Sequence, residues 1–247
     1  MTNKGGVVAE ELEEPSFTNL GTVVTISVGV DGRPFVIHKD LLYYHSAYFR
    51  NLFKGSFIEA KSSVMQVEDT TVETFGHFVE WLYTTVARRP LPACHRVATS
   101  FVDPANPDPP SLDELLDVYI FADRYNICLL RNDVMKSWQY RNYNWGTICN
   151  ELCEDMIKKA FDKLPHSSTL CRYIVQNYAT MNFWIFPPME RELWAKLPHE
   201  FLSELIMIAS TVLQPRSKPI DTKSCDFHEH KNEVEKKECI ESLWWSE

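Results

Sequence analysis

Glycine is scarce in this sequence, with eight residues in 247, and so few glycines leave little backbone that could surround a phosphate group. The G-x-x-x-x-G-K-S/T phosphate loop and the G-x-G-x-x-G dinucleotide fingerprint are both absent. So are the G-x-S-x-G turn of serine hydrolases and the H-E-x-x-H helix of zinc proteases. The sequence therefore carries no standard motif of these enzyme classes.

Basic residues and long apolar runs are also few. Lysine and arginine total 25 against 34 aspartate and glutamate residues, which gives a net charge of −9 and an isoelectric point near 5.4. Because such a chain has no strong positive field, we expect no direct nucleic-acid partner. The longest apolar stretch, residues 201–213, is interrupted by Ser203, Glu204 and Ser210 and is too short to span a bilayer, so we expect no membrane segment.

The N-terminus and the cysteines bear on the compartment. Residues 1–16 carry an acidic cluster and lack the apolar core of a signal peptide. The seven cysteines are odd in number and irregularly spaced, which is typical of reduced thiols rather than of a disulfide framework. We therefore expect an intracellular protein, with nucleus and cytoplasm left open. Its 45% hydrophobic residues are ample for a packed core.

The first predicted elements follow a mobile acidic leader at residues 1–20. The β-branched run 22–30 predicts a strand, residues 31–34 (DGRP) predict a turn, and residues 35–38 predict a second strand, so together they form a hairpin. Residues 38–53, HKDLLYYHSAYFRNLF, then place apolar side chains at helical spacing on more than one face. This pattern predicts two short helices that are buried against more than one surface.

The rest of the chain is predicted to be mainly helical. A short strand is expected at 64–67 and an amphipathic helix at 72–86. Six prolines lie between residues 87 and 110, and because proline removes backbone donors they predict a loop or a disordered insert. A capping box at Ser111 to Glu114 restarts the helical pattern, which continues to about residue 213.

The order of these elements, with the residues inside them, resembles the BTB/POZ domain. The first part of the match contains Val28-Gly29, Phe35, Val36, His38, Lys39, Leu41, Leu42, Ser46, Tyr48 and Phe49. The second part contains Val67-Glu68-Asp69, Phe75, Phe78, Trp81-Leu82-Tyr83, Leu115-Leu116, Val118-Tyr119, Ala122-Asp123, Tyr125 and Ile127. The resemblance implies an α+β fold, a small β-sheet flanked by helices, over residues 21–140 with the proline-rich insert at 87–110. After this domain we expect an all-α region at 141–213, which is similar to the helices after the BTB domain in stand-alone fungal proteins. A polar tail is expected at 214–247.

In that family the matched residues have structural roles. The resemblance implies that His38 hydrogen-bonds under the hairpin, that Leu42 and Phe49 fill the core together with Leu41, and that Ser46 caps the next helix. The family self-associates partly through its first helix, and the residues that we expect on this dimer face are Leu41, Tyr44, His45 and Tyr48. Two alternatives stay open: a one-sided core helix with exposed tyrosines, and catalysis by the neighbouring His38 and Asp40, for which no nucleophile motif is present.

We therefore expect a non-enzymatic protein–protein interaction module that forms a homodimer and acts as an adaptor or scaffold. One form of this function is an adaptor for a cullin scaffold in ubiquitin ligation. Cullin adaptors of the family often carry a hydrophobic-x-Glu motif after the third helix, and this chain has no glutamate between Trp81 and Ser111. The alternative is a self-associating scaffold of the transcription or corepressor type with no ubiquitin link.

The tail contains one cluster of residues with metal-binding chemistry: Cys225, His228, His230 and Cys239. Thiolate and imidazole are the ligand set of structural zinc, although this spacing is not that of a standard finger. Four protein ligands would leave no open position for catalysis, so a metal-dependent enzyme is the remote alternative. The other interpretation of the tail is a charged, solvated segment without a metal.

Overall fold

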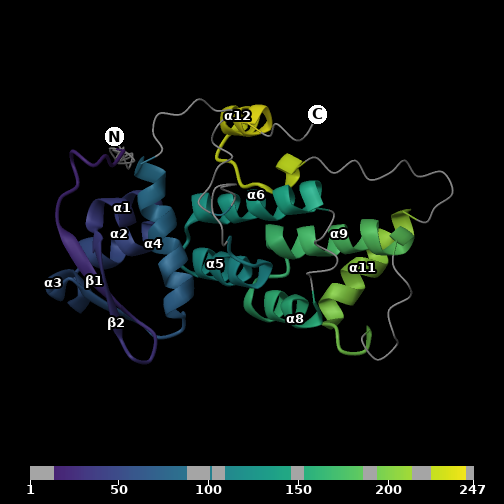
Figure 1. Ribbon diagram of the computed structural model, residues 1–247, viewed down its shortest axis with the longest axis horizontal. Helices are drawn as coiled ribbons and strands as arrows, with labels where there is room; N and C mark the ends of the chain where they lie inside the picture. The colour runs from purple at the N-terminus through teal and green to yellow at the C-terminus, as the bar shows by residue number, and fades with distance from the viewer. Residues whose placement is uncertain are drawn as a thin grey trace, which may run out of the picture.

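The computed structural model describes residues 14–87, 101, 109–145, 153–185, 194–212 and 224–242. A small sheet and the first helices lie at one end of the molecule, and a body of longer helices lies at the other (Figure 1). The predicted fold class is confirmed: a three-stranded sheet flanked by helices precedes an all-helical region. Within the described residues, no helix is both long and apolar enough for a bilayer crossing.

The sheet consists of β1 (Val23–Val28), β2 (Arg33–His38) and β3 (Val64–Val67) in the order β2-β1-β3. β1 pairs antiparallel with β2 and parallel with β3. Because side chains alternate along a strand, every second residue of β1 faces the core. These residues are Val24, Ile26 and Val28, all at most 1% exposed.

The hairpin turn differs from the expected one at residues 31–34. Residues 29–32 make the turn, since Val28 pairs with Arg33 and both Gly29 and Gly32 have positive φ angles, of 75° and 63°. Glycine adopts this backbone conformation without the steric penalty of a side chain. Pro34 instead lies within β2, which is an edge strand of the sheet. Proline has no backbone N–H to donate, and an edge strand tolerates this loss because one of its sides has no partner strand.

The helices of the N-terminal half are α1 (Lys39–His45), α2 (Ala47–Lys54), α3 (Ile58–Ser62) and α4 (Val72–Ala87). Of these, α3 was not predicted from the sequence. It is five residues long and none of them is buried, so it has no apolar periodicity to detect.

The remaining elements are α5 (Leu112–Arg124), α6 (Cys128–Trp145), α8 (Glu154–Lys163), α9 (Thr169–Ile185), α11 (His199–Val212), the 3-10 helix η2 (Ser224–Phe227) and α12 (Glu233–Ser242). The predicted capping box is present at α5, where Ser111 and Glu114 exchange hydrogen bonds. Parts of several predicted regions fall outside the described residues: most of the leader at 1–20, most of the proline-rich insert at 87–110, residues 146–152 and 186–193 of the helical region, and both ends of the polar tail.

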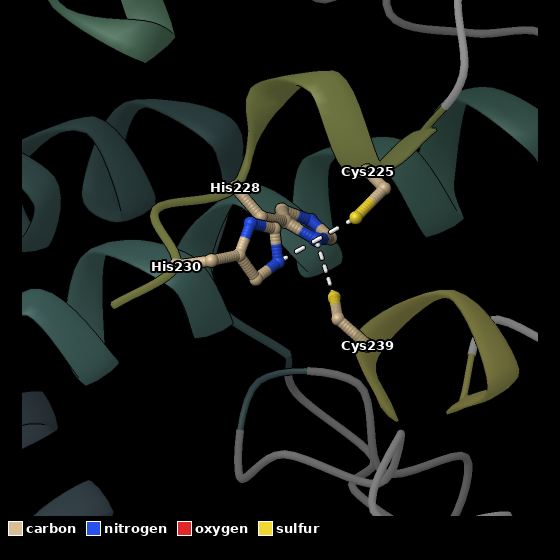
Figure 2. A group of neighbouring side chains, drawn as sticks. All are labelled: Cys225, His228, His230 and Cys239. Atoms are coloured by element: carbon tan, nitrogen blue, oxygen red, sulfur yellow. Dashed lines mark hydrogen bonds between the residues drawn. The ribbon is translucent and has the colours of Figure 1, made fainter. Parts of the chain in front are cut away.

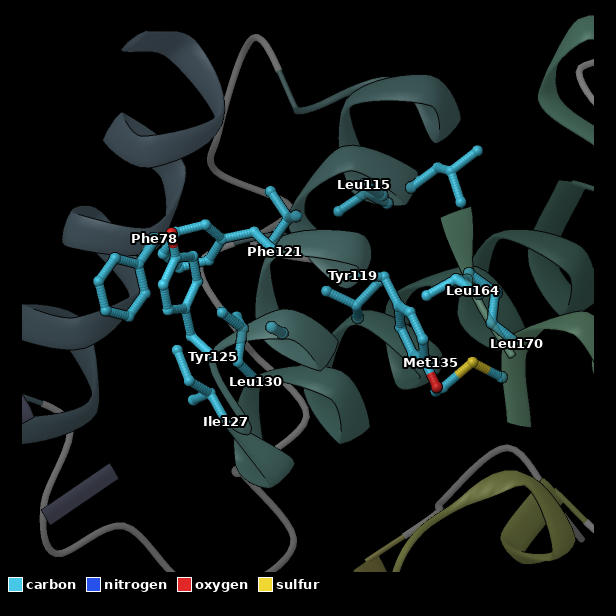
Figure 3. Packing of buried hydrophobic residues seen from close by; sticks show 14 of the residues in the cluster. Phe78, Leu115, Tyr119, Phe121, Tyr125, Ile127, Leu130, Met135, Leu164 and Leu170 are labelled. Atoms are coloured by element: carbon cyan, nitrogen blue, oxygen red, sulfur yellow. The ribbon is translucent and has the colours of Figure 1, made fainter. Parts of the chain in front are cut away.

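One hydrophobic core joins the sheet end to the helical end. Figure 3 shows its middle part, where Phe78 of α4 approaches Phe121 and Tyr125, and Tyr119 lies near Met135 and Leu170. The same cluster reaches Phe227 near the C-terminus. The helical region therefore packs as a continuation of the N-terminal half.

Candidate functional site

The corner between α1 and α2 is held by Ser46, which is 1% exposed. Its hydroxyl accepts a hydrogen bond of 3.2 Å from the amide of Phe49, which caps the N-terminus of α2. The same hydroxyl donates a 2.7 Å hydrogen bond to the carbonyl oxygen of Tyr125, just after α5. Ser46 therefore fixes both the local corner and its position against α5.

His38 and Asp40 have separate partners. The Nδ1 atom of His38 lies 2.8 Å from the hydroxyl of Tyr83 on α4. The carboxylate of Asp40 accepts a 2.7 Å hydrogen bond from the amide of Gly21, ahead of β1. These contacts tie the strand and the helix to their surroundings, which is a structural role for both side chains.

The four residues expected on a dimer face divide into two groups. Leu41 is fully buried, as are Leu42 and Phe49. Leu41 therefore packs in the core of its own chain, as the resemblance implied, because α1 lies against β2 and α2, and it has no exposed surface to offer a dimer face in this structure. Tyr44 and His45 are partly buried and Tyr48 is 42% exposed, so these three line the outer surface.

Aromatic contacts hold this surface in place. The ring of His45 lies 5.0 Å from the rings of both Tyr44 and Trp81, and its Nε2 is 3.3 Å from the hydroxyl of Thr85. Burial lowers the pKa of His45 to about 4, so the imidazole is neutral at pH 7. The rings of Tyr48 and Tyr125 meet in a T-shaped arrangement, with their centroids 5.1 Å apart. We call Tyr44, His45 and Tyr48 the aromatic surface.

The second candidate site is the group of Cys225, His228, His230 and Cys239, which the structure brings together. Their ligand atoms all lie within 4.8 Å of one another, and the four side chains point toward a common centre (Figure 2). The Sγ of Cys225 is 3.5 Å from the Nε2 of His230, and the Nδ1 of His228 is 3.0 Å from the Sγ of Cys239. The arrangement has the residue types and the convergence that a metal ion requires.

Residues of α6 support this cluster, and no pattern in the sequence predicted their contribution. The Nε2 of His228 lies 2.9 Å from the Oε1 of the buried Gln139. Asn132 binds the backbone of Glu229 from both sides, donating to its carbonyl at 2.8 Å and accepting from its amide at 2.9 Å. These partners are about ninety residues away in the chain, so no local pattern could have indicated them.

Burial favours the uncharged forms of the cluster side chains. It lowers the pKa of His228 to about 3, with a smaller effect from the nearby Lys136. Burial also raises the pKa of the Cys225 thiol to about 12, and raises the pKa of Cys239. The imidazole of His228 is therefore neutral, and one of its two ring nitrogens carries a lone pair.

Comparison with known families identifies the N-terminal half. Residues 16–101 match the family model of the BTB/POZ domain, which agrees with the hairpin, the α1–α2 corner and α4. The chain therefore contains a BTB/POZ domain, a module for protein–protein interaction.

The similar curated proteins also contain this domain. Kelch repeat and BTB domain-containing protein 4 of Mus musculus is 25% identical over 126 residues, which make up 51% of this chain and 18% of that protein. Its counterparts in Homo sapiens and Pongo abelii are 28% identical over 78 residues, 32% of this chain and 14% of each relative. The chain thus spans less than a fifth of the length of these relatives.

Proposed function

We propose that the protein is a non-enzymatic adaptor or scaffold that self-associates through its BTB/POZ domain and recruits other proteins. The family match over residues 16–101 is the observation that carries this proposal, because the domain is an interaction module. The separate hydrogen-bond partners of His38 and Asp40 support the non-enzymatic part.

The proposed occupant of the aromatic surface is a second copy of the chain. Aromatic side chains are enriched in the centres of interfaces, where they bury a large area at a small cost in conformational entropy. Tyr48 is one of the exposed large hydrophobic residues, and Tyr44 and His45 lie beside it on α1. Leu41 and Leu42 support this helix from inside the chain, so the surface is backed by packed core.

Two versions of the adaptor role follow. In the first, the dimer links a client to a cullin-type ubiquitin ligase, and the similar kelch repeat and BTB proteins motivate this version. In the second, the dimer is a corepressor-type scaffold without a ligase. The absence of glutamate between Trp81 and Ser111 favours the second version, because the usual hydrophobic-x-Glu contact is missing.

A pull-down with purified cullin scaffold separates the versions. The full chain is the bait, and circular dichroism checks that it is folded. Binding to the cullin supports the ligase version, and no binding from folded, dimeric protein removes it. Affinity purification from cells followed by mass spectrometry then identifies the partners. If no partner depends on residues 16–101, the interaction proposal as a whole is wrong.

A further inference from the structure

We propose that Cys225, His228, His230 and Cys239 bind one Zn²⁺ ion in a tetrahedral structural site, and that this ion fastens the segment 224–242 across α6. The four residues come from η2, from the loop after it and from α12. A single ion would therefore join three parts of the segment.

The distances suit such an ion. With Zn–S bonds of about 2.3 Å and Zn–N bonds of about 2.0–2.1 Å, neighbouring ligand atoms of a tetrahedral site are about 3.3–3.8 Å apart. In the structure the ligand atoms are 3.0 Å apart between His228 and Cys239 and 3.5 Å apart between Cys225 and His230, and none of the other separations exceeds 4.8 Å. Small side-chain rotations bring all four atoms to bonding distance.

The hydrogen bond to Gln139 selects the ligating nitrogen of His228. The amide oxygen of Gln139 accepts, so the imidazole carries its hydrogen on Nε2 and keeps the lone pair on Nδ1. That Nδ1 faces the sulfur of Cys239 at the centre of the cluster. Such a second hydrogen bond is the usual support of a metal-bound histidine, and it sets both the tautomer and the orientation of the ring.

The donor set favours zinc over other cations. Two sulfur and two nitrogen atoms in a tetrahedral arrangement suit Zn²⁺, whereas Mg²⁺ and Ca²⁺ take oxygen ligands. Binding converts the two thiols to thiolates and releases two protons to solvent, so the complete site is neutral and needs no oxidant. All four positions are filled by the protein, which makes the site structural.

The packing of α12 gives an independent reason for an ion. This helix is ten residues long, and an isolated helix of that length is only marginally stable in water. Val234 is 67% exposed, and Cys239 with Tyr140 forms only a small apolar cluster around Cys225. Since little apolar surface is buried there, a metal bond to Cys239 would supply the stability that packing does not.

The test is the metal content of the full chain, purified with a reductant and without chelator. We expect one zinc per chain by elemental mass spectrometry, and on Co²⁺ substitution the absorption bands of a tetrahedral thiolate site. Cys225→Ser and Cys239→Ser should each lose this zinc. Cys153→Ser is the matched control, because Cys153 is a free, exposed cysteine outside the cluster, and it should keep the zinc.

Two further measurements keep the proposal testable if a ligand variant fails to fold. Gln139→Leu removes the hydrogen bond to His228 while keeping all four ligands, and should weaken zinc binding about 10–100-fold in a chelator competition, with one ion still bound at saturation. Removal of zinc from the unmutated chain should increase hydrogen exchange in the amides of 224–242. A folded chain without zinc affinity, zinc retained by Cys225→Ser, or a Cys225–Cys239 disulfide in the purified protein would each overturn the proposal.

Discussion

Arg131 on α6 binds Glu229, 98 residues later in the chain, through two parallel hydrogen bonds of 2.6 and 2.7 Å from Nε and Nη2. The arginine is 8% exposed, and its Nη1 also lies 3.7 Å from Asp123. A two-point pair with this geometry holds the loop between His228 and His230 against the helical body. The C-terminal segment is therefore built into the fold through α6.

We expect Glu229→Ala to destabilise the protein. The change leaves the buried guanidinium with weaker contacts, a 3.4 Å hydrogen bond from Nη1 to the carbonyl of Ala122 and a 3.7 Å contact to Asp123. Loss of one partner of a fully buried pair costs about 3–5 kcal/mol, and because the Glu229 side chain is 34% exposed we expect about 1–3 kcal/mol. Urea unfolding measures the change. Asp162→Ala removes the exposed pair with Lys163 and serves as the control, with an expected effect below about 0.5 kcal/mol.

Ser46→Ala should cost more than the loss of a helix cap alone. A cap contributes about 0.5–2 kcal/mol, and this substitution also removes the donor to the buried carbonyl of Tyr125, so we expect about 2–3 kcal/mol in total. Ser111→Ala at α5 is the matched control, because its hydroxyl caps a helix at an exposed position. Equal losses of unfolding free energy in the two variants would contradict the role of the Tyr125 contact.

Acid should weaken the fold through His45. Its pKa is about 4 in the folded protein and about 6.5 in an unfolded chain, so the unfolded state takes up the proton first as the pH falls. The free energy of unfolding should not depend on His45 above about pH 6.5, should fall by about 1.4 kcal/mol per pH unit between about 6.5 and 4, and should lose at most about 3.4 kcal/mol.

The measurement is urea unfolding at several pH values for the unmutated chain and for His45→Gln. The glutamine variant removes the titrating group, so the difference in stability between the two proteins should shrink or change sign as the pH decreases. Parallel pH profiles would show that His45 is not buried in its neutral form.

Much of the fold could be predicted because its signals are local. Alternating apolar residues mark β1, and an apolar stripe at helical spacing marks α4. The capping box at Ser111 marks the start of α5. The short α3 buries no residue, and the hairpin turn depends on the backbone angles of Gly29 and Gly32, so neither has a clear local pattern.

Some residues of the candidate sites could be predicted from the sequence, and others could not. The four cysteine and histidine residues lie within fifteen positions and could be found by residue type, but Gln139 and Asn132 reach them from α6 through tertiary packing. The dimer face expected from the sequence included Leu41 together with Tyr44 and Tyr48. Only the three-dimensional packing separates the buried leucine from the two tyrosines at the surface.

Charges on the aromatic surface should disrupt self-association without unfolding the chain. Tyr48→Asp places a carboxylate on a side chain that is 42% exposed, where it would have to be desolvated in an interface. We expect the dissociation constant of the dimer to rise by at least about tenfold, which corresponds to about 1.4 kcal/mol. Val30→Asp in the hairpin turn, at a 94% exposed position, is the control and should leave the dimer unchanged.

Sedimentation equilibrium of the unmutated chain over a range of concentrations measures self-association itself. We expect a mass of twice 28.7 kDa, with dissociation to the single-chain mass only on dilution. A folded protein that stays at 28.7 kDa at every concentration would contradict self-association through the BTB/POZ domain.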